Sequence, residues 1–168
     1  MAQVAKEILI GQTLDFTQNP FEAGLEAVKH DSRGSVLIED GKIVALGNAA
    51  ELRTAHPDAK ITDYGEDLIL PGFVDPHVHY PQTAMIASWG KRLIDWLNSY
   101  TFPEEMSFDD PNYAKEIAKR FFDLSLSHGT TTVASFCTIH PESVEAFFEE
   151  ARARGLCAVG GKTCMDRN

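Results

Sequence analysis

The stretch Pro71–Gln82 constrains the fold more than any other part of the sequence, because it places His77 and His79 two positions apart in an apolar run. In a β-strand such side chains share one face of the sheet, whereas a helix separates them. A strand would therefore aim both imidazoles at one point, and neutral imidazole is a good ligand for zinc. Catalytic metal sites usually take about three protein ligands, so the pair predicts part of a metal site. The alternative is two ordinary polar or core histidines.

Asp75 lies two residues before this pair, so a regular strand would place it on the same face. Its carboxylate could orient one of the imidazoles through a hydrogen bond. It could equally cap the backbone at the end of the strand.

After this run, helical and extended patterns alternate. Asp110 followed by Pro111 is typical of a helix start, and Gly129 and Gly155 are typical helix ends. The β-branched run 130–136 is typical of a buried parallel strand. The predicted order is strand 71–79, helix 111–128, strand 130–136, helix 141–154 and strand 156–160. This alternation indicates an α/β fold with a parallel sheet.

About 30 residues between His79 and Asp110 lack regular periodicity, and a loop of that length is usually functional or mobile. Trp96 and Tyr100 recur at helical spacing together with Leu93 and Leu97, so we expect these side chains to pack in the core. Their rings would also suit stacking on a flat heterocycle.

The first 70 residues predict short strands at 8–16, 35–39, 43–46 and 60–70. The pair Asp40–Gly41 predicts a tight hairpin turn, because both positions tolerate positive φ. Asn48 is a suitable N-cap for a short helix that ends near Ala55. The polar stretch 29–34 is predicted to be a surface loop.

The composition argues against several classes of protein. The formal net charge is −10 and no basic run occurs, which argues against binding to nucleic acid. No apolar run approaches the ~20 residues of a membrane span, and the N-terminus lacks the pattern of a signal peptide. The 3 cysteines lack CxxC spacing, so we expect a reducing, cytoplasmic location.

The run Leu70–His79 resembles the Pro-Gly-(aliphatic or Phe)-(Val or Ile)-Asp-x-His-x-His motif of the amidohydrolase superfamily. Within that superfamily, Tyr80–Gln82, Trp96–Glu105 and Gly161–Asn168 are similar to the guanine deaminase family. The resemblance implies that residues 71–168 form the first strands and helices of a (β/α)8 (TIM) barrel, which remains incomplete. Residues 1–70 would form the N-terminal part of a small β-sandwich. Because a whole barrel takes about 250 residues, the 168-residue chain is expected to be the N-terminal part of a longer enzyme or the product of an early stop.

The function that the resemblance implies is zinc-dependent hydrolytic deamination of guanine to xanthine and ammonia, a step of purine catabolism. His77 and His79 would be two zinc ligands. His79, Tyr80, Pro81 and Gln82 would line the purine cleft, and Gln82 would hydrogen-bond the purine edge. The other ligands and the acid–base carboxylates are expected beyond residue 168, so the chain alone should be inactive. The complete enzyme is expected to be a homodimer.

Two alternatives remain open. The chain could belong to an amidohydrolase that acts on another heterocyclic amine or on a chlorotriazine. It could also be a non-catalytic fragment that associates with itself or with another chain, because an open parallel sheet exposes edges and apolar faces.

Overall fold

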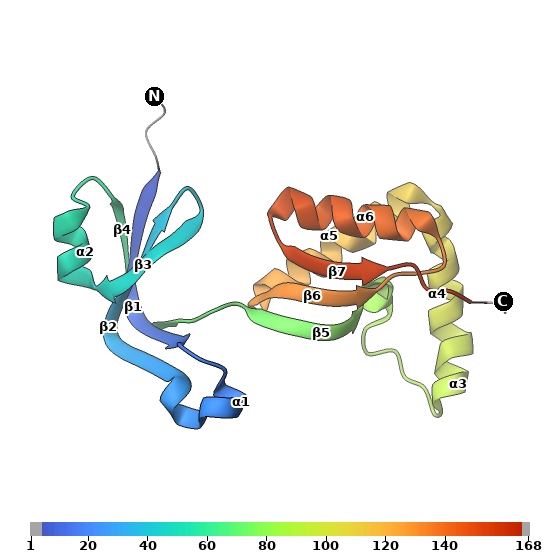
Figure 1. Cartoon of the computed structure of the whole chain (residues 1–168). Coiled ribbons are helices and arrows are strands. Elements are labelled where there is room, and N and C mark those ends of the chain that lie inside the picture. The colour runs from blue at the N-terminus through green and yellow to red at the C-terminus, as the bar shows by residue number, and fades with distance from the viewer. Residues whose placement is uncertain (1–4, 166–168) are drawn as a thin grey trace. The chain divides into compact units, whose positions relative to one another are not determined.

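The chain folds around two separate β-sheets, one before and one after the Pro71–Gly72 junction (Figure 1). The structure is a computed structural model and describes residues 5–165. No helix in this range is long and apolar enough to cross a membrane. The two units are described separately below.

The first unit is built on a sheet with strand order β3-β2-β1-β4. Strand β1 pairs antiparallel with β2 and parallel with β4, and β2 pairs antiparallel with β3. The short helix α2 covers a small core. The strands are β1 (Lys6–Phe16), β2 (Val28–Glu39), β3 (Lys42–Asn48) and β4 (Lys60–Ile69); the helices are α1 (Pro20–Ala23), a 3-10 turn (Gly24–Ala27) and α2 (Ala49–Ala55).

The residues at the turns of this unit correctly predicted its hairpin and its helix start. Asp40 (φ 49°) and Gly41 (φ 77°) form the predicted tight hairpin between β2 and β3. The side chain of Asn48 accepts hydrogen bonds from Ala50 N (2.8 Å) and Glu51 N (3.4 Å), which confirms the predicted helix cap.

The predicted loop at 29–34 is wrong. Strand β2 begins at Val28, and its pairing with β1 continues past a register irregularity near Gly11 as far as Phe16 opposite Val28. Most side chains of the stretch 29–34 are exposed, so their polar character costs little. The ladder of backbone hydrogen bonds holds the strand together there without an apolar face.

The second unit contains three parallel strands, β5 (Phe73–His79), β6 (Thr130–Phe136) and β7 (Cys157–Gly161), side by side in chain order. The helices α5 (Pro111–Ser127) and α6 (Pro141–Arg154) cover one face of this sheet (Figure 1). The predicted order of strands and helices is confirmed. Asp110 caps α5 by accepting from Asn112 N (2.9 Å), and Gly129 and Gly155 adopt positive φ after the two helices.

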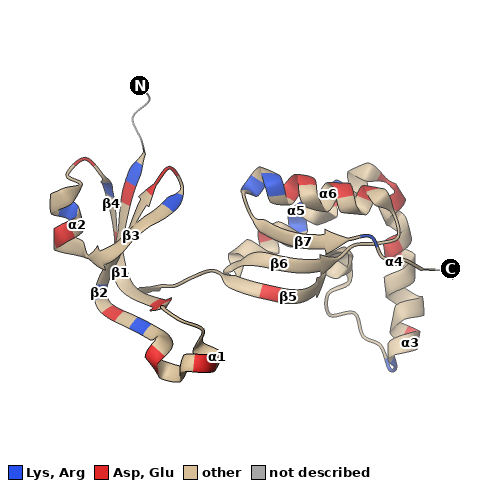
Figure 2. Cartoon of the chain, in the orientation of Figure 1, with Lys and Arg blue, Asp and Glu red and all other residues tan. Residues whose placement is uncertain are grey.

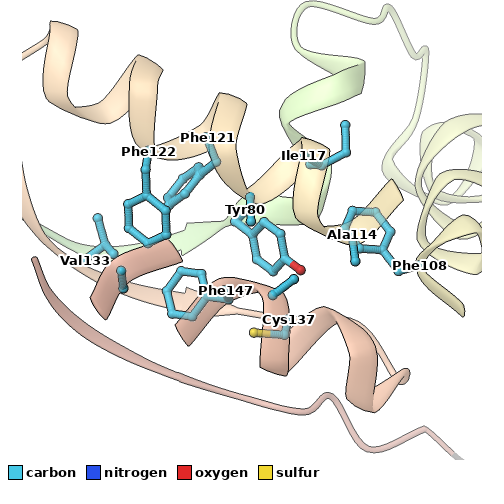
Figure 3. Packing of buried hydrophobic residues seen from close by; sticks show 12 residues of the cluster. Tyr80, Phe108, Ala114, Ile117, Phe121, Phe122, Val133, Cys137 and Phe147 are labelled. Atoms are coloured by element: carbon cyan, nitrogen blue, oxygen red, sulfur yellow. The ribbon is translucent and has the colours of Figure 1, made fainter. Parts of the chain in front are cut away.

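The core of the second unit lies between the two helices and the sheet. Its centre is a group of aromatic rings, Tyr80, Phe108, Phe121, Phe122 and Phe147 (Figure 3). Tyr80 stacks on Phe147 with ring centroids 5.3 Å apart and meets Phe108 edge-on at 5.6 Å. Such offset and edge-on contacts add to the stabilisation from burial alone.

The segment between His79 and Asp110 is not an irregular loop. It contains a 3-10 helix (Tyr80–Met85), α3 (Leu93–Trp96), a π-helical turn (Leu97–Thr101), α4 (Phe102–Met106) and a further 3-10 turn (Ser107–Asp109). The predicted burial fails for Leu93 (71% exposed) and Tyr100 (39% exposed), whereas Trp96 is half-buried. The hydrogen-bonding pattern changes from α to π at Leu97, so the regular α-helical period on which the prediction rested does not continue through this segment.

Candidate active site

His77 and His79 lie near the carboxyl end of β5, with ring centroids 5.5 Å apart. Both residues border the same open cleft, which also runs along Phe121, Leu124 and Ser125 of α5. In a parallel sheet the carboxyl ends of neighbouring strands meet at one edge, which is where α/β folds bind their ligands. The strand therefore presents two imidazoles together at the functional end of this sheet.

The ring nitrogens of this pair are available to a metal ion. Across residues 5–165, no hydrogen bond engages an imidazole nitrogen of His77 or His79, although backbone N of His77 donates to Asp75. Burial and the neighbouring His77 both lower the pKa of His79. A neutral ring with a free nitrogen is the form that coordinates metals, so the donor set fits zinc.

Phe136 stands beside both imidazoles. It lies directly opposite His79 in the β5–β6 register. Its ring stacks on His79 at 4.8 Å with an interplanar angle of 20°, and it meets His77 edge-on at 5.5 Å. The side chain is 47% exposed. Both histidines therefore lie on the sheet face that α5 and α6 leave open.

Asp75 does not share that face. In the register Asp75 stands opposite buried Val133, and an irregularity between Asp75 and Val78 breaks the alternation of the strand. The Asp75 carboxylate accepts a hydrogen bond from the backbone N of His77 (3.1 Å). The structure thus favours the backbone cap over an orienting contact with an imidazole, and the regular strand that we predicted was too simple.

The cleft beside the histidines has a volume of about 810 Å³ and is open to solvent. This size suits a small heterocycle. Gln82 lines it, and so does Trp96, whose indole N–H donates to the carbonyl of Ser88 (3.1 Å). His128 also lines the cleft, and its Nδ1 lies 2.9 Å from the carbonyl of Leu124 at the end of α5.

Tyr80 and Pro81 were also predicted to line the purine cleft, and their part in substrate binding stays a prediction. Both are buried, Tyr80 completely, and neither borders the cleft. The Tyr80 hydroxyl donates to the carbonyl of Ser143 (2.6 Å), so its hydrogen-bonding capacity is satisfied inside the core. Of the predicted segment, only His79 and Gln82 reach the cleft.

Glu105 on α4 is a buried carboxyl group, 9% exposed. Burial raises the pKa of Glu105, and a side-chain hydrogen bond from Gln82 opposes this effect in part. No cation pairs with Glu105 in the described part of the chain. Gln82 therefore lies next to a buried acid and also borders the open cleft.

Between residues 5 and 165, no group of three or more His, Cys, Asp or Glu side chains is arranged to hold a metal ion. His77 and His79 form only part of a coordination sphere. The prediction that the other ligands and the catalytic carboxylates come from beyond residue 168 remains a prediction.

Phe136 and Glu105 were not identified as site residues from the sequence. The signal for Phe136 was available, because parallel strands bring their carboxyl ends together and Phe136 ends the strand after the histidines. Glu105 gave no comparable signal, since a glutamate in a short helix is usually exposed.

Comparisons with known proteins identify the family of the chain. Residues 68–168 match the model of the Amidohydrolase family, and residues 36–59 match an imidazolonepropionase-like composite domain of bacteria. The chain is 40% identical to guanine deaminase of Escherichia coli K12 over 162 residues, which is 94% of this chain and 37% of that enzyme.

Solved structures give the same relationship. The crystal structure of guanine deaminase from Bradyrhizobium japonicum is 37% identical with a TM-score of 0.88, covering 97% of this chain and 36% of that one. Guanine deaminase from C. acetobutylicum with bound guanine is 30% identical with a TM-score of 0.80, covering 97% and 37%. The chain thus spans about a third of the length of these relatives.

The fold class predicted from the sequence is confirmed. The described residues form an α/β structure that matches these amidohydrolase structures over the extent expected of a partial barrel. The Pro-Gly-Phe-Val-Asp-Pro-His-Val-His run lies within the matched range, on the first strand of the parallel sheet. This chain belongs to the amidohydrolase family.

Proposed function

We propose that this chain forms the N-terminal part of a zinc-dependent guanine deaminase, in which guanine is hydrolysed to xanthine and ammonia. The observation that carries the proposal is the placement of His77, His79 and Gln82 around one cleft of about 810 Å³. The similarity to guanine deaminases at about 40% identity supports it.

His77 and His79 would hold the metal, because their ring nitrogens make no hydrogen bond within the described residues and burial lowers the pKa of His79, which favours the neutral ring. A zinc ion supplies Lewis acidity, which lowers the pKa of water toward neutrality. Further metal ligands and a carboxylate that transfers protons would come from outside the described residues.

Gln82 would orient the purine. An amide offers both donors and an acceptor, and the edge of guanine presents both kinds of group. A hydrogen-bonding site of this type rejects rings that lack the matching groups, because its buried polar atoms would then be unpaired.

A chimera tests the proposal directly. The aligned region covers 37% of E. coli guanine deaminase. We would join this chain to the part of that enzyme that follows the aligned region. The loss of guanine would be followed by ultraviolet absorbance. We expect turnover by the chimera and none by the chain alone. His77→Ala or His79→Ala should lower turnover at least about 100-fold, because losing a ligand should exceed the 10–100-fold cost of losing an outer partner.

His30→Ala is the matched control, because His30 is an exposed residue of β2. Full activity in either ligand variant, or a folded chimera that leaves guanine unchanged, would reject the proposal. Turnover of guanine, cytosine and ammeline measured side by side distinguishes guanine from the other heterocyclic amines and from a triazine-type substrate.

The location and partners are proposed on separate grounds. All three cysteines are unpaired, which supports a reducing, cytoplasmic compartment. Acidic and basic side chains are interspersed along the chain (Figure 2), which supports the expectation that it binds no nucleic acid. The homodimer expected of the complete enzyme would be tested by light scattering on the active chimera.

A further inference from the structure

We propose that Phe136 is a positioning residue that fixes both imidazoles of the metal-binding pair in the orientation that a metal ion requires. This inference rests on the metal site of the proposed function. It assigns a role to an aromatic residue that contacts neither the cleft nor the helical core.

The geometry around Phe136 carries the proposal. One face of its ring stacks on His79, with centroids 4.8 Å apart and an interplanar angle of 20°. The same ring meets His77 edge-on, with centroids 5.5 Å apart and an angle of 61°. The two imidazoles are themselves 5.5 Å apart and tilted by 59°. One side chain thus restrains two rings that have no hydrogen bond of their own in the described part of the chain.

The location of Phe136 makes a packing role in the core a poor explanation. Its ring is 47% exposed and lies on the face of the sheet opposite to α5 and α6. The neighbouring residues of β6 that do pack in the core, Val133 and Ser135, are 3% and 5% exposed. Both aromatic contacts of its ring within the described residues are with the histidines.

The chemistry of Phe136 suits this role. Metal-binding histidines usually have their orientation fixed by a hydrogen bond at the second ring nitrogen. Here a ring without donors or acceptors restrains both imidazoles by stacking and leaves every nitrogen free. Preorganised ligands bind a metal more tightly, because less side-chain freedom is lost when the metal binds.

Zinc affinity of the whole chain tests the proposal without any need for catalysis. Zinc would be titrated at fixed pH while the ring resonances of His77 and His79 are followed by NMR. We expect Phe136→Leu to weaken zinc binding about 3- to 10-fold, the range that loss of an aromatic contact predicts. Phe136→Tyr keeps the ring and should bind zinc as the unchanged chain does. The His79 ring protons should show an upfield ring-current shift that disappears only in Phe136→Leu.

Phe148→Leu is the matched control. Phe148 is a half-buried residue of α6 that contacts Phe147 edge-on at 5.3 Å and touches neither histidine. Its replacement should leave zinc affinity unchanged. Equal zinc affinity in Phe136→Leu and the unchanged chain, or no ring-current shift at His79 in the unchanged chain, would overturn the role of Phe136 and leave guanine deamination standing. Absence of zinc binding by these histidines in the chimera with E. coli guanine deaminase as well would reject the metal pair itself, and this inference with it.

Discussion

Tyr80 shows how a single residue connects the histidine-bearing strand to the rest of the second unit. Its backbone N donates to Ser135 Oγ (3.0 Å), and its hydroxyl donates to the carbonyl of Ser143 (2.6 Å) and lies 2.8 Å from Ser143 Oγ. Burial raises the pKa of Tyr80, so the hydroxyl remains protonated and able to donate. The residue that follows His79 is thereby anchored to β6 and to α6.

Tyr80→Phe should destabilise the second unit by about 1–3 kcal/mol, because the buried carbonyl of Ser143 loses its donor. Both tryptophans, Trp89 and Trp96, belong to this unit, so urea unfolding followed by tryptophan fluorescence reports on it. Tyr64→Phe is the control, since Tyr64 is 47% exposed on β4. Equal loss of stability in the two variants would contradict the role of the buried hydroxyl.

Glu105 predicts a pH dependence of stability. Burial raises its pKa in the folded state above the value in the unfolded chain. The folded state therefore favours the protonated acid, and its stabilising contribution is present below the ordinary glutamate pKa and is lost as pH rises through the raised one. The free energy of unfolding should therefore fall between about pH 4.5 and 7.5. The total fall is about 1.4 kcal/mol for each pKa unit by which Glu105 in the folded state exceeds Glu105 in the unfolded chain.

Glu105→Gln should remove this slope, because a neutral amide has no proton to lose. The variant should be more stable than the unchanged chain at pH 7.5. Glu145→Gln is the control, since Glu145 is an exposed residue of α6. If the unfolding free energy of Glu105→Gln still falls with rising pH, another group causes the pH dependence.

At the scale of helices and strands, local chemistry predicted where elements begin and end. Asp110, Asn48 and the Asp40–Gly41 pair act as predicted, because caps and tight turns depend on a few neighbouring atoms. The polar half of β2 could not be predicted from its own side chains, since it is a strand only through its pairing with β1. The π-helical turn at Leu97–Thr101 has no sequence pattern of its own.

The site likewise combines features that the sequence predicts with features that it does not. The strand period predicted that His77 and His79 would share one face, and the family resemblance implied that Gln82 lies near them; all three border one cleft. The strand period could not predict that Tyr80 would turn into the core or that a register irregularity would take Asp75 away from the histidine face. The position of Tyr80 depends on partners in β6 and α6 that follow it by more than 50 residues in the chain.

Gly72 allows the close approach of the first two strands of the parallel sheet. A Cβ at this position would lie 2.1 Å from Thr131 Oγ1. Gly72→Ala should therefore destabilise the second unit by about 1–3 kcal/mol, as overpacking does, measured by urea unfolding. Gly161→Ala is the control, because its added methyl group would meet no atom within 4 Å. Thr131→Ala should recover part of the loss in a double variant; failure to do so would place the strain elsewhere.

For the molecule as a whole, the parallel sheet has two unpaired edges and one open face. Its order is β5-β6-β7, so β5 and β7 each lack a partner on one side within the described residues. Apolar side chains on its strands are exposed, with Val74 at 65% and Val159 at 64%. Exposed edges and apolar patches promote association.

Light scattering on the chain alone should show a mass that grows with concentration. Val159→Lys should lower this association, because a charge on the open sheet opposes stacking. Leu126→Lys is the control, since Leu126 is a 39% exposed residue of α5. A constant monomer mass across the concentration range would contradict the expectation.

The anchoring of Tyr80 has a consequence for biosynthesis. Its partners Ser135 and Ser143 follow it by 55 and 63 positions. A ribosome that adds about 5–20 residues per second exposes the paired imidazoles several seconds before those partners emerge. The nascent strand therefore lacks these two hydrogen-bond partners until translation has delivered β6 and α6.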